Sequence, residues 1–192
     1  LSGGFAVRSG WGAAPELAFS VGGLHPNFEP PANFPSLERM AIDLSRGSAF
    51  RLRIEGYFAI TSNSLQLGAA LDFAAESGGF GVYADMGFDA LLIIDPFSLD
   101  VAVRAGASIK ADGSTICSVR LKGRLTGPGP WRARGSASIQ VLFFDVSVGF
   151  DASFGSAEDN VIRPVHLWND HLQPALREPA HFRAETEGGP LV

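Results

Sequence analysis

Residues 80–109 read FGVYADMGFDALLIIDPFSLDVAVRAGASI, and apolar side chains occupy nearly every second position of this stretch. The same alternation extends outward from Ala49 to Gly155, interrupted only by short polar or glycine-containing segments. A period of two is typical of half-buried β-strands, whereas an amphipathic helix needs apolar residues three and four positions apart. The sequence therefore predicts an all-β fold, a meander of antiparallel strands of roughly ten to thirteen residues each.

The parity of the apolar positions predicts how neighbouring strands are joined. Between Ile109 and Cys117 the apolar positions stay odd-numbered, which predicts a three-residue loop, Ala111–Gly113, with Gly113 left-handed in a bulge. This register places Asp100 opposite Arg124 and Arg104 opposite Arg120. Between Val141 and Phe144 the parity switches without a typical turn residue, so a bulge in one bent strand and a tight turn remain alternatives.

Such a meander has one continuous apolar face, which has to be kept from water. Each large side chain on it contributes about 1.5–3 kcal/mol once buried. The sheet can close into a barrel, fold over its own face as a gutter or sandwich, or be covered by neighbouring chain. We expect a long-stranded meander that is curled or closed, in a barrel-like or gutter-like form.

The flanking regions complete a single β domain of 192 residues. Residues 1–48 hold two short strand patterns, a proline-rich loop over 23–36 and an edge-strand pattern at Leu37–Leu44. Residues 49–155 form the meander. Residues 156–192 contain a polar linker, a polar tail and a short helix over Leu167–Arg177, with Asn169 or Asp170 as its cap. This helix is expected to cover an open end of the sheet or to lead to a following domain.

Composition excludes several classes of protein. With 46% hydrophobic and 18% charged residues, the chain has the composition of a folded domain rather than a disordered one. A net charge of −5 argues against a dedicated nucleic-acid binder. Cys117 is the only cysteine, so an internal disulfide is impossible, which fits the cytosol and a disulfide-poor bacterial surface equally. Because the chain starts at Leu1, as if in mid-sheet, we expect a segment or processed product of a longer protein.

Several short motifs spread over most of residues 3–183 carry a family resemblance. They are GGLHP at 22–26, FPSL at 34–37, RIEGYFAITSN at 53–63, FDAL at 88–91, GPGPW at 127–131 and FFDV at 143–146. Through these motifs the chain resembles an uncharacterised family of very large, β-rich bacterial proteins, a domain of unknown function. Leu24 departs from the pattern, where Phe is expected. The resemblance implies a bacterial origin and a longer parent chain, but no activity and no catalytic residues.

Candidate catalytic and metal-binding residues are few. His166, His171 and His181 are close in sequence, but their spacing puts no pair on one helical turn, as a zinc site on a helix requires. His25 is interpreted as a loop residue that hydrogen-bonds backbone. Six aspartates fall on the polar face and are interpreted as partners of neighbouring arginines rather than as an acid/base pair: Asp72, Asp85, Asp89, Asp100, Asp145 and Asp151. We therefore predict no enzyme activity, no catalytic residues, no metal site and no cofactor.

The most specific surface feature is a basic stripe on two consecutive strands, formed by Arg120, Lys122, Arg124, Arg132 and Arg134. Like charges on neighbouring strands repel unless acidic groups lie nearby. The stripe is either neutralised by an adjacent acidic strand or binds lipid head groups, acidic glycans or an acidic protein.

These observations favour a non-enzymatic structural or interaction module of a larger bacterial protein or assembly, with other segments or subunits as its partners. The alternative is a carrier of lipid or another apolar ligand inside a barrel or gutter. A carrier of this kind needs an internal cavity of about 300 Å³ or more. An outer-membrane barrel fits less well, because the chain has few tyrosines for an aromatic girdle and a helix without a place in it.

Overall fold

The computed structural model describes residues 1–11, 15–47, 49–156 and 173–177. The chain divides into two compact units, Leu1–Asn160 and Val161–Val192. The described part of the second unit is one short helix, α1 (Gln173–Arg177). The predicted helix therefore exists at its C-terminal end, whereas its start and both candidate caps lie outside the described residues. No helix in the described ranges is long and apolar enough to cross a membrane.

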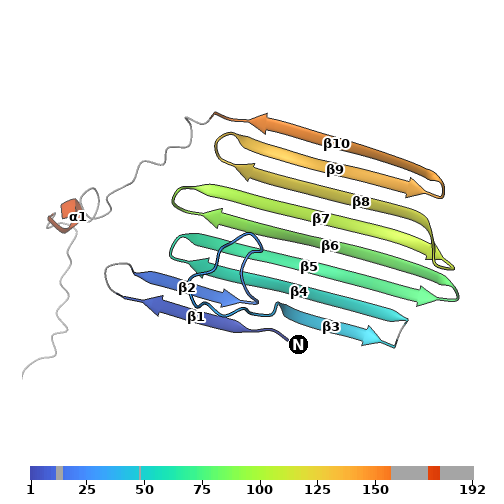
Figure 1. The fold of residues 1–192 in the computed structure, drawn as a ribbon, viewed down its shortest axis with the longest axis horizontal. Helices are drawn as coiled ribbons and strands as arrows, with labels where there is room; N and C mark the ends of the chain where they lie inside the picture. The colour runs from blue at the N-terminus through green and yellow to red at the C-terminus, as the bar shows by residue number, and fades with distance from the viewer. Residues whose placement is uncertain (12–14, 48, 157–172, 178–192) are drawn as a thin grey trace, which may run out of the picture. The chain divides into compact units, whose positions relative to one another are not determined.

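The first unit is a single antiparallel sheet of ten strands (Figure 1). Nine strands follow the order β1-β2-β4-β5-β6-β7-β8-β9-β10, and β3 pairs with β4 beside β2. The strands are β1 (Phe5–Gly10), β2 (Glu16–Val21), β3 (Met40–Arg46), β4 (Phe50–Thr61), β5 (Ser64–Ser77), β6 (Phe80–Ile93), β7 (Ser98–Ala111), β8 (Ser114–Gly127), β9 (Trp131–Val141) and β10 (Phe144–Phe154). The predicted all-β antiparallel meander is confirmed.

The connection between β7 and β8 differs from the predicted one. Asp112 and Gly113 form a two-residue turn with φ angles of 47° and 82°, the left-handed geometry that suits a tight hairpin. A register shift between Ile109 and Lys110 restores the parity of the apolar positions. As a result Asp100 lies opposite Thr126 and Arg124 opposite Ala102. The predicted register was wrong by two residues because the irregularity lies inside the strand pair rather than in the loop.

The connection between β9 and β10 is a tight turn, which decides between the two alternatives left open by the sequence. Val141 pairs with Phe144, so the turn consists of Leu142 and Phe143. Leu142 has a φ of 53°, although it is not a glycine. The parity switch thus marks a hairpin without the usual turn residues.

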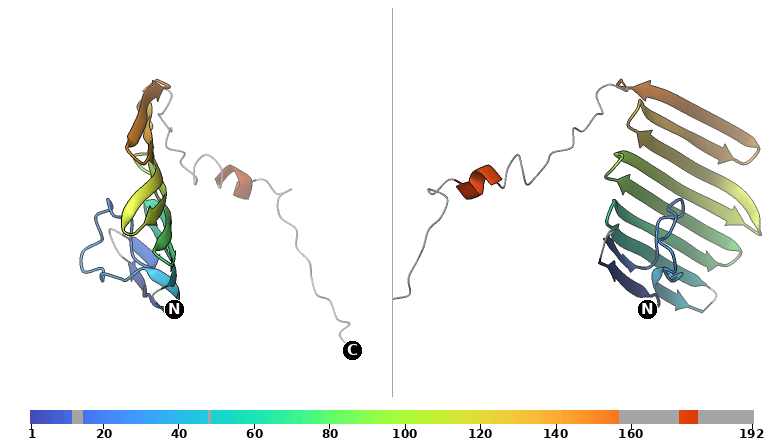
Figure 2. Two further views of the ribbon diagram at one scale, coloured as in Figure 1. Left: turned by 90° about the vertical axis from the view of Figure 1, so that its right-hand side faces the viewer. Right: turned by 60° about the vertical axis from the view of Figure 1, so that its left-hand side comes forward.

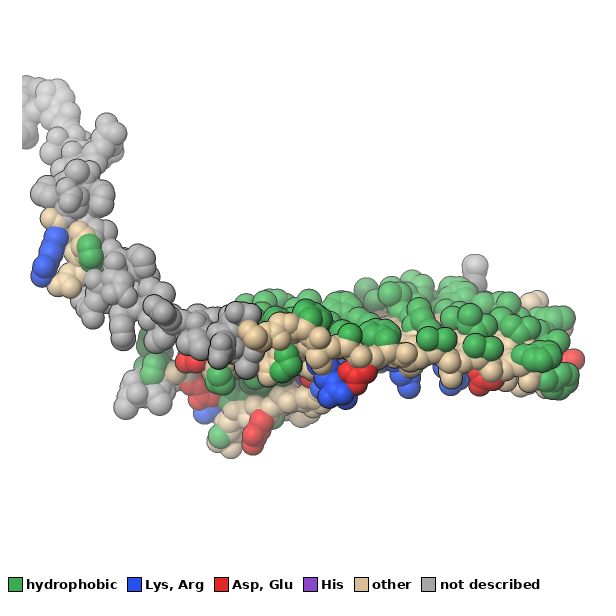
Figure 3. Space-filling view, turned by 90° about the horizontal axis from the view of Figure 1, so that it is seen from above, with side chains coloured by type: hydrophobic (Ala, Val, Ile, Leu, Met, Phe, Trp, Pro, Cys, Tyr) green, Lys and Arg blue, Asp and Glu red, His purple; other side chains and the backbone are tan. Residues whose placement is uncertain are grey.

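All the predicted apolar sets lie on one face of the sheet. One row of directly paired residues crosses it from β4 to β10: Phe58, Leu67, Ala90, Val101, Leu125, Ala133 and Ala152. From β4 to β10 no residue on this face is charged. Figure 3 shows the consequence, with hydrophobic side chains on one side of the sheet and charged side chains on the other. We call these two sides the apolar face and the polar face.

The sheet is open and single-layered, so the expected curled or closed form is not confirmed (Figure 2). The order of strands ends at β1 on one side and at β10 on the other, and no pairing joins them.

Burial is deepest on the polar face, contrary to expectation. The largest fully buried side chains are Gln66, Ser20 and Ser64, which all lie beneath or beside the segment 22–39. This segment, drawn in blue beside the sheet in Figure 2, packs on the polar face. On the apolar face Phe80 is 61% exposed and Phe150 is 59% exposed. The described part of one chain therefore leaves its apolar face open to water.

Candidate functional site

Buried polar side chains anchor the segment 22–39 to the polar face. Gln66 of β5 is fully buried, and its Oε1 accepts a hydrogen bond from the backbone N–H of His25 at 2.8 Å. Its Nε2 donates to Ser64 Oγ at 2.9 Å. Ser20 of β2 donates to the carbonyl of Gly23 at 2.6 Å. Every buried side-chain nitrogen and oxygen of the described residues has a partner, which avoids the cost of about 1–3 kcal/mol for a buried unsatisfied group.

Tyr57 of β4 is the central side chain of this anchor. Its ring covers Gly68 of β5, where a Cβ would lie 2.3 Å from Tyr57 Cε1. The guanidinium of Arg39 lies 3.6 Å from the ring centroid, and the Tyr57 hydroxyl donates to Asp89 Oδ1 at 3.0 Å. Burial, followed by the charge of Asp89, raises the pKa of Tyr57. An aromatic ring resting on a glycine of the next strand fixes the position of both strands.

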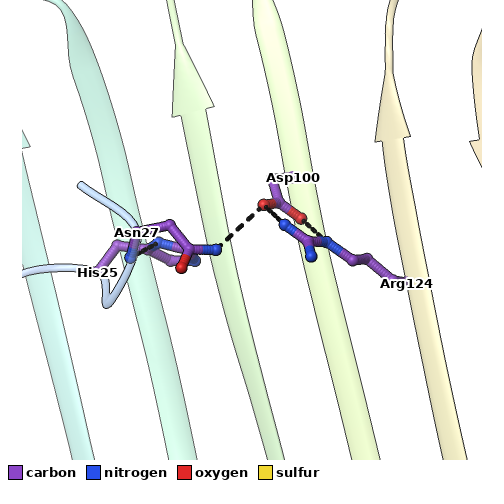
Figure 4. Close-up of polar contacts among 4 residues, drawn as sticks. All are labelled: His25, Asn27, Asp100 and Arg124. Carbon is purple, nitrogen blue, oxygen red and sulfur yellow. Dashed lines mark hydrogen bonds and ion pairs between the residues drawn. The ribbon is translucent and has the colours of Figure 1, made fainter.

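The imidazole of His25 connects the anchor to the centre of the sheet. Its Nδ1 accepts a hydrogen bond from the backbone N–H of Asn27 at 3.1 Å, which confirms the prediction of a loop histidine bonded to backbone. Asn27 Nδ2 in turn donates to Asp100 Oδ2 at 3.5 Å, and Asp100 accepts two bonds from Arg124 (Figure 4). The segment is thus tied to β5 directly and to β7 through Asn27.

This geometry predicts a loss of stability in mild acid. Burial lowers the pKa of His25 from its ordinary value of 6.5, although Asp89 and Asp100 act in the opposite direction. The unfolded chain therefore binds this proton more readily than the folded chain, so the stability is present above about pH 6.5 and is lost as the pH falls below it. Protonation also removes the acceptor that Nδ1 offers to Asn27. We expect the free energy of unfolding in urea to fall between about pH 7.5 and pH 5.

The matched control for this prediction is His25→Asn, which keeps a short acceptor but does not titrate in this range. Its unfolding free energy is expected to change less than that of the wild type over the same pH interval. An equal change in both proteins would assign the pH dependence to other groups.

A small hollow lies beside the anchor. It has a volume of about 170 Å³, and its charged lining residues are Arg39, Glu55, Asp89 and Arg104. Two cations and two acids balance each other there, and the volume is below the roughly 300–1,000 Å³ of typical ligand pockets. We therefore assign no ligand to this hollow.

The basic stripe predicted from the sequence lies on the polar face of β8 and β9, but two of its five members form ion pairs with aspartates. Arg124 donates to Asp100 from two of its guanidinium nitrogens, Nε at 2.8 Å and Nη2 at 2.5 Å. Arg132 binds Asp151 in the same way, at 2.9 and 2.5 Å. Hydrogen bonds from these guanidinium groups lower the pKa of both aspartates. The partnership of Asp100 and Arg124 is confirmed, although the two residues sit diagonally rather than opposite each other.

Three members of the stripe stay without an ion pair among the described residues: Arg120, Lys122 and Arg134. We call them the open cation group. Arg120 and Lys122 lie opposite Ser138 and Ser136, and Arg134 lies opposite Arg124 on β8 and Asp151 on β10. The expected pairing of Arg104 with Arg120 is wrong. Arg104 lies opposite Lys122 and forms an ion pair with Asp89 at 3.6 Å.

The remaining candidate residues are not assembled into a reactive site by the described structure. The six aspartates lie on the polar face as predicted, and Asp72 and Asp85 are directly opposite each other. No group of three or more metal-binding side chains occurs among the described residues. His166, His171 and His181 lie outside those residues. Cys117 lies on the apolar face, opposite Ile109, and is half-buried.

Sequence reasoning missed the anchor residues Ser20, Arg39, Tyr57 and Gln66. Polar residues alternate with apolar ones along every strand, so nothing local distinguishes Gln66 from a solvated position. The available signal was indirect. Gly68 stands at a strand position where a side chain would normally be placed, and a glycine inside a strand marks a close approach by another group.

Comparison with models of protein families gave a match. Residues 1–189 match a family described as "Family of unknown function (DUF6603)". Neither the comparison with curated proteins nor the comparison with solved structures gave a match. The match covers the sheet and the region after it, and its description assigns no activity.

Proposed function

We propose that this chain, which belongs to the DUF6603 family of unknown function, is a non-enzymatic structural module that binds protein through its apolar face. The observation that carries this proposal is the uncharged, exposed face of β4–β10. Among the described residues no group of three or more metal-binding side chains competes with this function.

The size of the apolar face supports the proposal. Seven strands of 11–14 residues, with a rise of about 3.3 Å per residue and a spacing of about 4.8 Å, give a face of roughly 1,400 Å². The largest apolar patch of a typical monomeric protein covers only about 300–600 Å². Large side chains are exposed from the middle to the end of the face, as at Met86 (56%), Val103 (50%) and Val148 (67%). A surface of this kind is expected to have a partner.

A carrier of lipid or another apolar ligand is the second candidate. It is favoured by the absence of charge on the apolar face of β4–β10, along which acyl chains could lie. The open cation group is on the opposite side of the single-layered sheet, so the head group of a lipid on the apolar face would not reach it. Since this geometry separates the charges from the apolar surface, we place the carrier second.

Two matched substitutions test the proposal. Val103→Glu places a charge on the apolar face, and Ser136→Glu places the same charge on the polar face, opposite Lys122. We expect Cys117 of the purified wild type to react with a thiol reagent at least about tenfold more slowly than in the unfolded chain, because a partner surface covers the apolar face. Val103→Glu should restore most of the reactivity, and Ser136→Glu should leave it low.

Mass spectrometry of extracted protein separates the two candidate functions. Protection of Cys117 without bound lipid supports the structural module. Protection that depends on lipid in about equal molar amount would replace it by the carrier. A soluble single chain with an unprotected Cys117 and no lipid would show that the face needs no partner, and would contradict both functions.

A further inference from the structure

We infer that the partner of the apolar face is a second copy of the chain, packed face to face in a two-layered β-sandwich. This inference rests on the proposed function and gives the partner that the proposed function leaves open. Three properties of the described residues support it: the location of the covering segment, the area of the face and the distribution of large and small side chains.

The described residues leave the apolar face uncovered. The segment 22–39 lies on the polar face, where His25 is bound by Gln66 and Asn27 by Asp100. A surface of similar size and chemistry is required, and an identical sheet has both.

The area agrees with that of a stable dimer. Specific protein interfaces bury about 800 Å² per partner, and obligate homodimers bury about 1,000–2,500 Å² per partner. A face of roughly 1,400 Å² falls within the second range. Two sheets pack about 10 Å apart with their strands nearly aligned, and each then excludes water from the other.

The side chains of the face are distributed so that two copies complement each other. A two-fold axis parallel to β7 and midway between the two sheets places β4 of one copy over β10 of the other, β5 over β9 and β6 over β8. In the paired row that crosses the face, Phe58 then lies over Ala152, Leu67 over Ala133 and Ala90 over Leu125, so that large side chains meet small ones. Such an interface is closed and uses the same patch twice.

Pairing through the edges of the sheet is less favourable than face-to-face packing. β10 is an edge strand whose eleven residues are all exposed, and a second β10 could add to it by backbone hydrogen bonds. A joint of this kind extends the sheet but leaves both apolar faces in water. Face-to-face packing removes the larger unfavourable surface.

Light scattering on the purified full chain tests the inference. We expect a mass of twice 20.3 kDa at micromolar concentration, with Cys117 protected. Val103→Glu should give the mass of one chain and expose Cys117, while Ser136→Glu should remain a dimer. Ile139→Glu, at a second position of the apolar face that is 51% exposed, provides an independent variant. Circular dichroism of each variant checks that its strand content is retained.

Each other result has a distinct meaning. A larger assembly with Cys117 protected would overturn the dimer and leave the proposed function standing. A dimer that survives both face variants and reacts freely at Cys117 would be paired through its edges, which overturns the inference. A single chain with an unprotected Cys117 and no lipid would overturn the dimer and the proposed function together.

Discussion

Replacing Gly22 by alanine is expected to lower the free energy of unfolding by about 3 kcal/mol or more. Gly22 has a φ of +76°, which an L-residue adopts at a cost of about 1–2 kcal/mol. In addition, its Cβ would lie 2.4 Å from the carbonyl oxygen of Gly56 and 2.9 Å from the backbone nitrogen of Met40. Both contacts are backbone atoms of strands, so neither can move without breaking the ladder between β3 and β4.

Gly78→Ala is the matched control for this substitution. Gly78 has a φ of +57°, but a Cβ there would meet nothing within 4 Å. Its substitution should therefore cost only the conformational part, about 1–2 kcal/mol. Chemical denaturation of both variants measures the difference. Equal losses in the two proteins would show that the close approach of Gly22 to β3 and β4 has no energetic importance.

Tyr57→Ala is expected to lower the free energy of unfolding by about 3–5 kcal/mol, the range for truncating a large buried aromatic side chain. The substitution removes the ring that covers Gly68, the surface on which Arg39 rests and the hydrogen bond to Asp89. It also removes the T-shaped contact between the rings of Tyr57 and His25, whose centroids lie 6.5 Å apart. We therefore expect the segment 22–39 to become susceptible to proteolysis at a denaturant concentration at which the wild type resists.

Tyr57→Phe separates the contributions of the ring and of the hydroxyl. It keeps the ring over Gly68 and beneath Arg39, and removes only the bond to Asp89. A loss of about 1 kcal/mol is expected, as for one hydrogen bond. If Tyr57→Phe were as destabilising as Tyr57→Ala, the anchor would depend on the hydroxyl and not on the ring.

The two faces of the sheet have separate roles in this interpretation. On the polar face the anchor of Ser20, His25, Tyr57 and Gln66 holds the segment 22–39 and includes the two largest fully buried side chains of the described residues, Gln66 and Ser20. The apolar face is left for a partner. Substitutions in the anchor should therefore reduce stability without changing the partner, while charges on the apolar face should change association first.

The sequence by itself determined which side chains share a face. Alternation is a local property of a strand, so Phe58, Leu67 and Val101 could be assigned to one side before any pairing was known. The order of the meander and the polar position of the stripe followed in the same way. The register between β7 and β8 did not follow, because a two-residue turn plus one irregularity between Ile109 and Lys110 gives the same parity as the predicted three-residue loop, with every later pair shifted by two residues.

Only the tertiary structure decided which face is covered. Hydrophobicity predicts the face that should be buried, but the path of the segment 22–39 depends on the distant contacts of His25 with Gln66 and of Asn27 with Asp100. The same holds for the charges, since Asp151 and Asp100 remove Arg132 and Arg124 from the stripe through pairs between strands. Contacts of this kind join residues far apart in the chain, and local patterns carry no information about them.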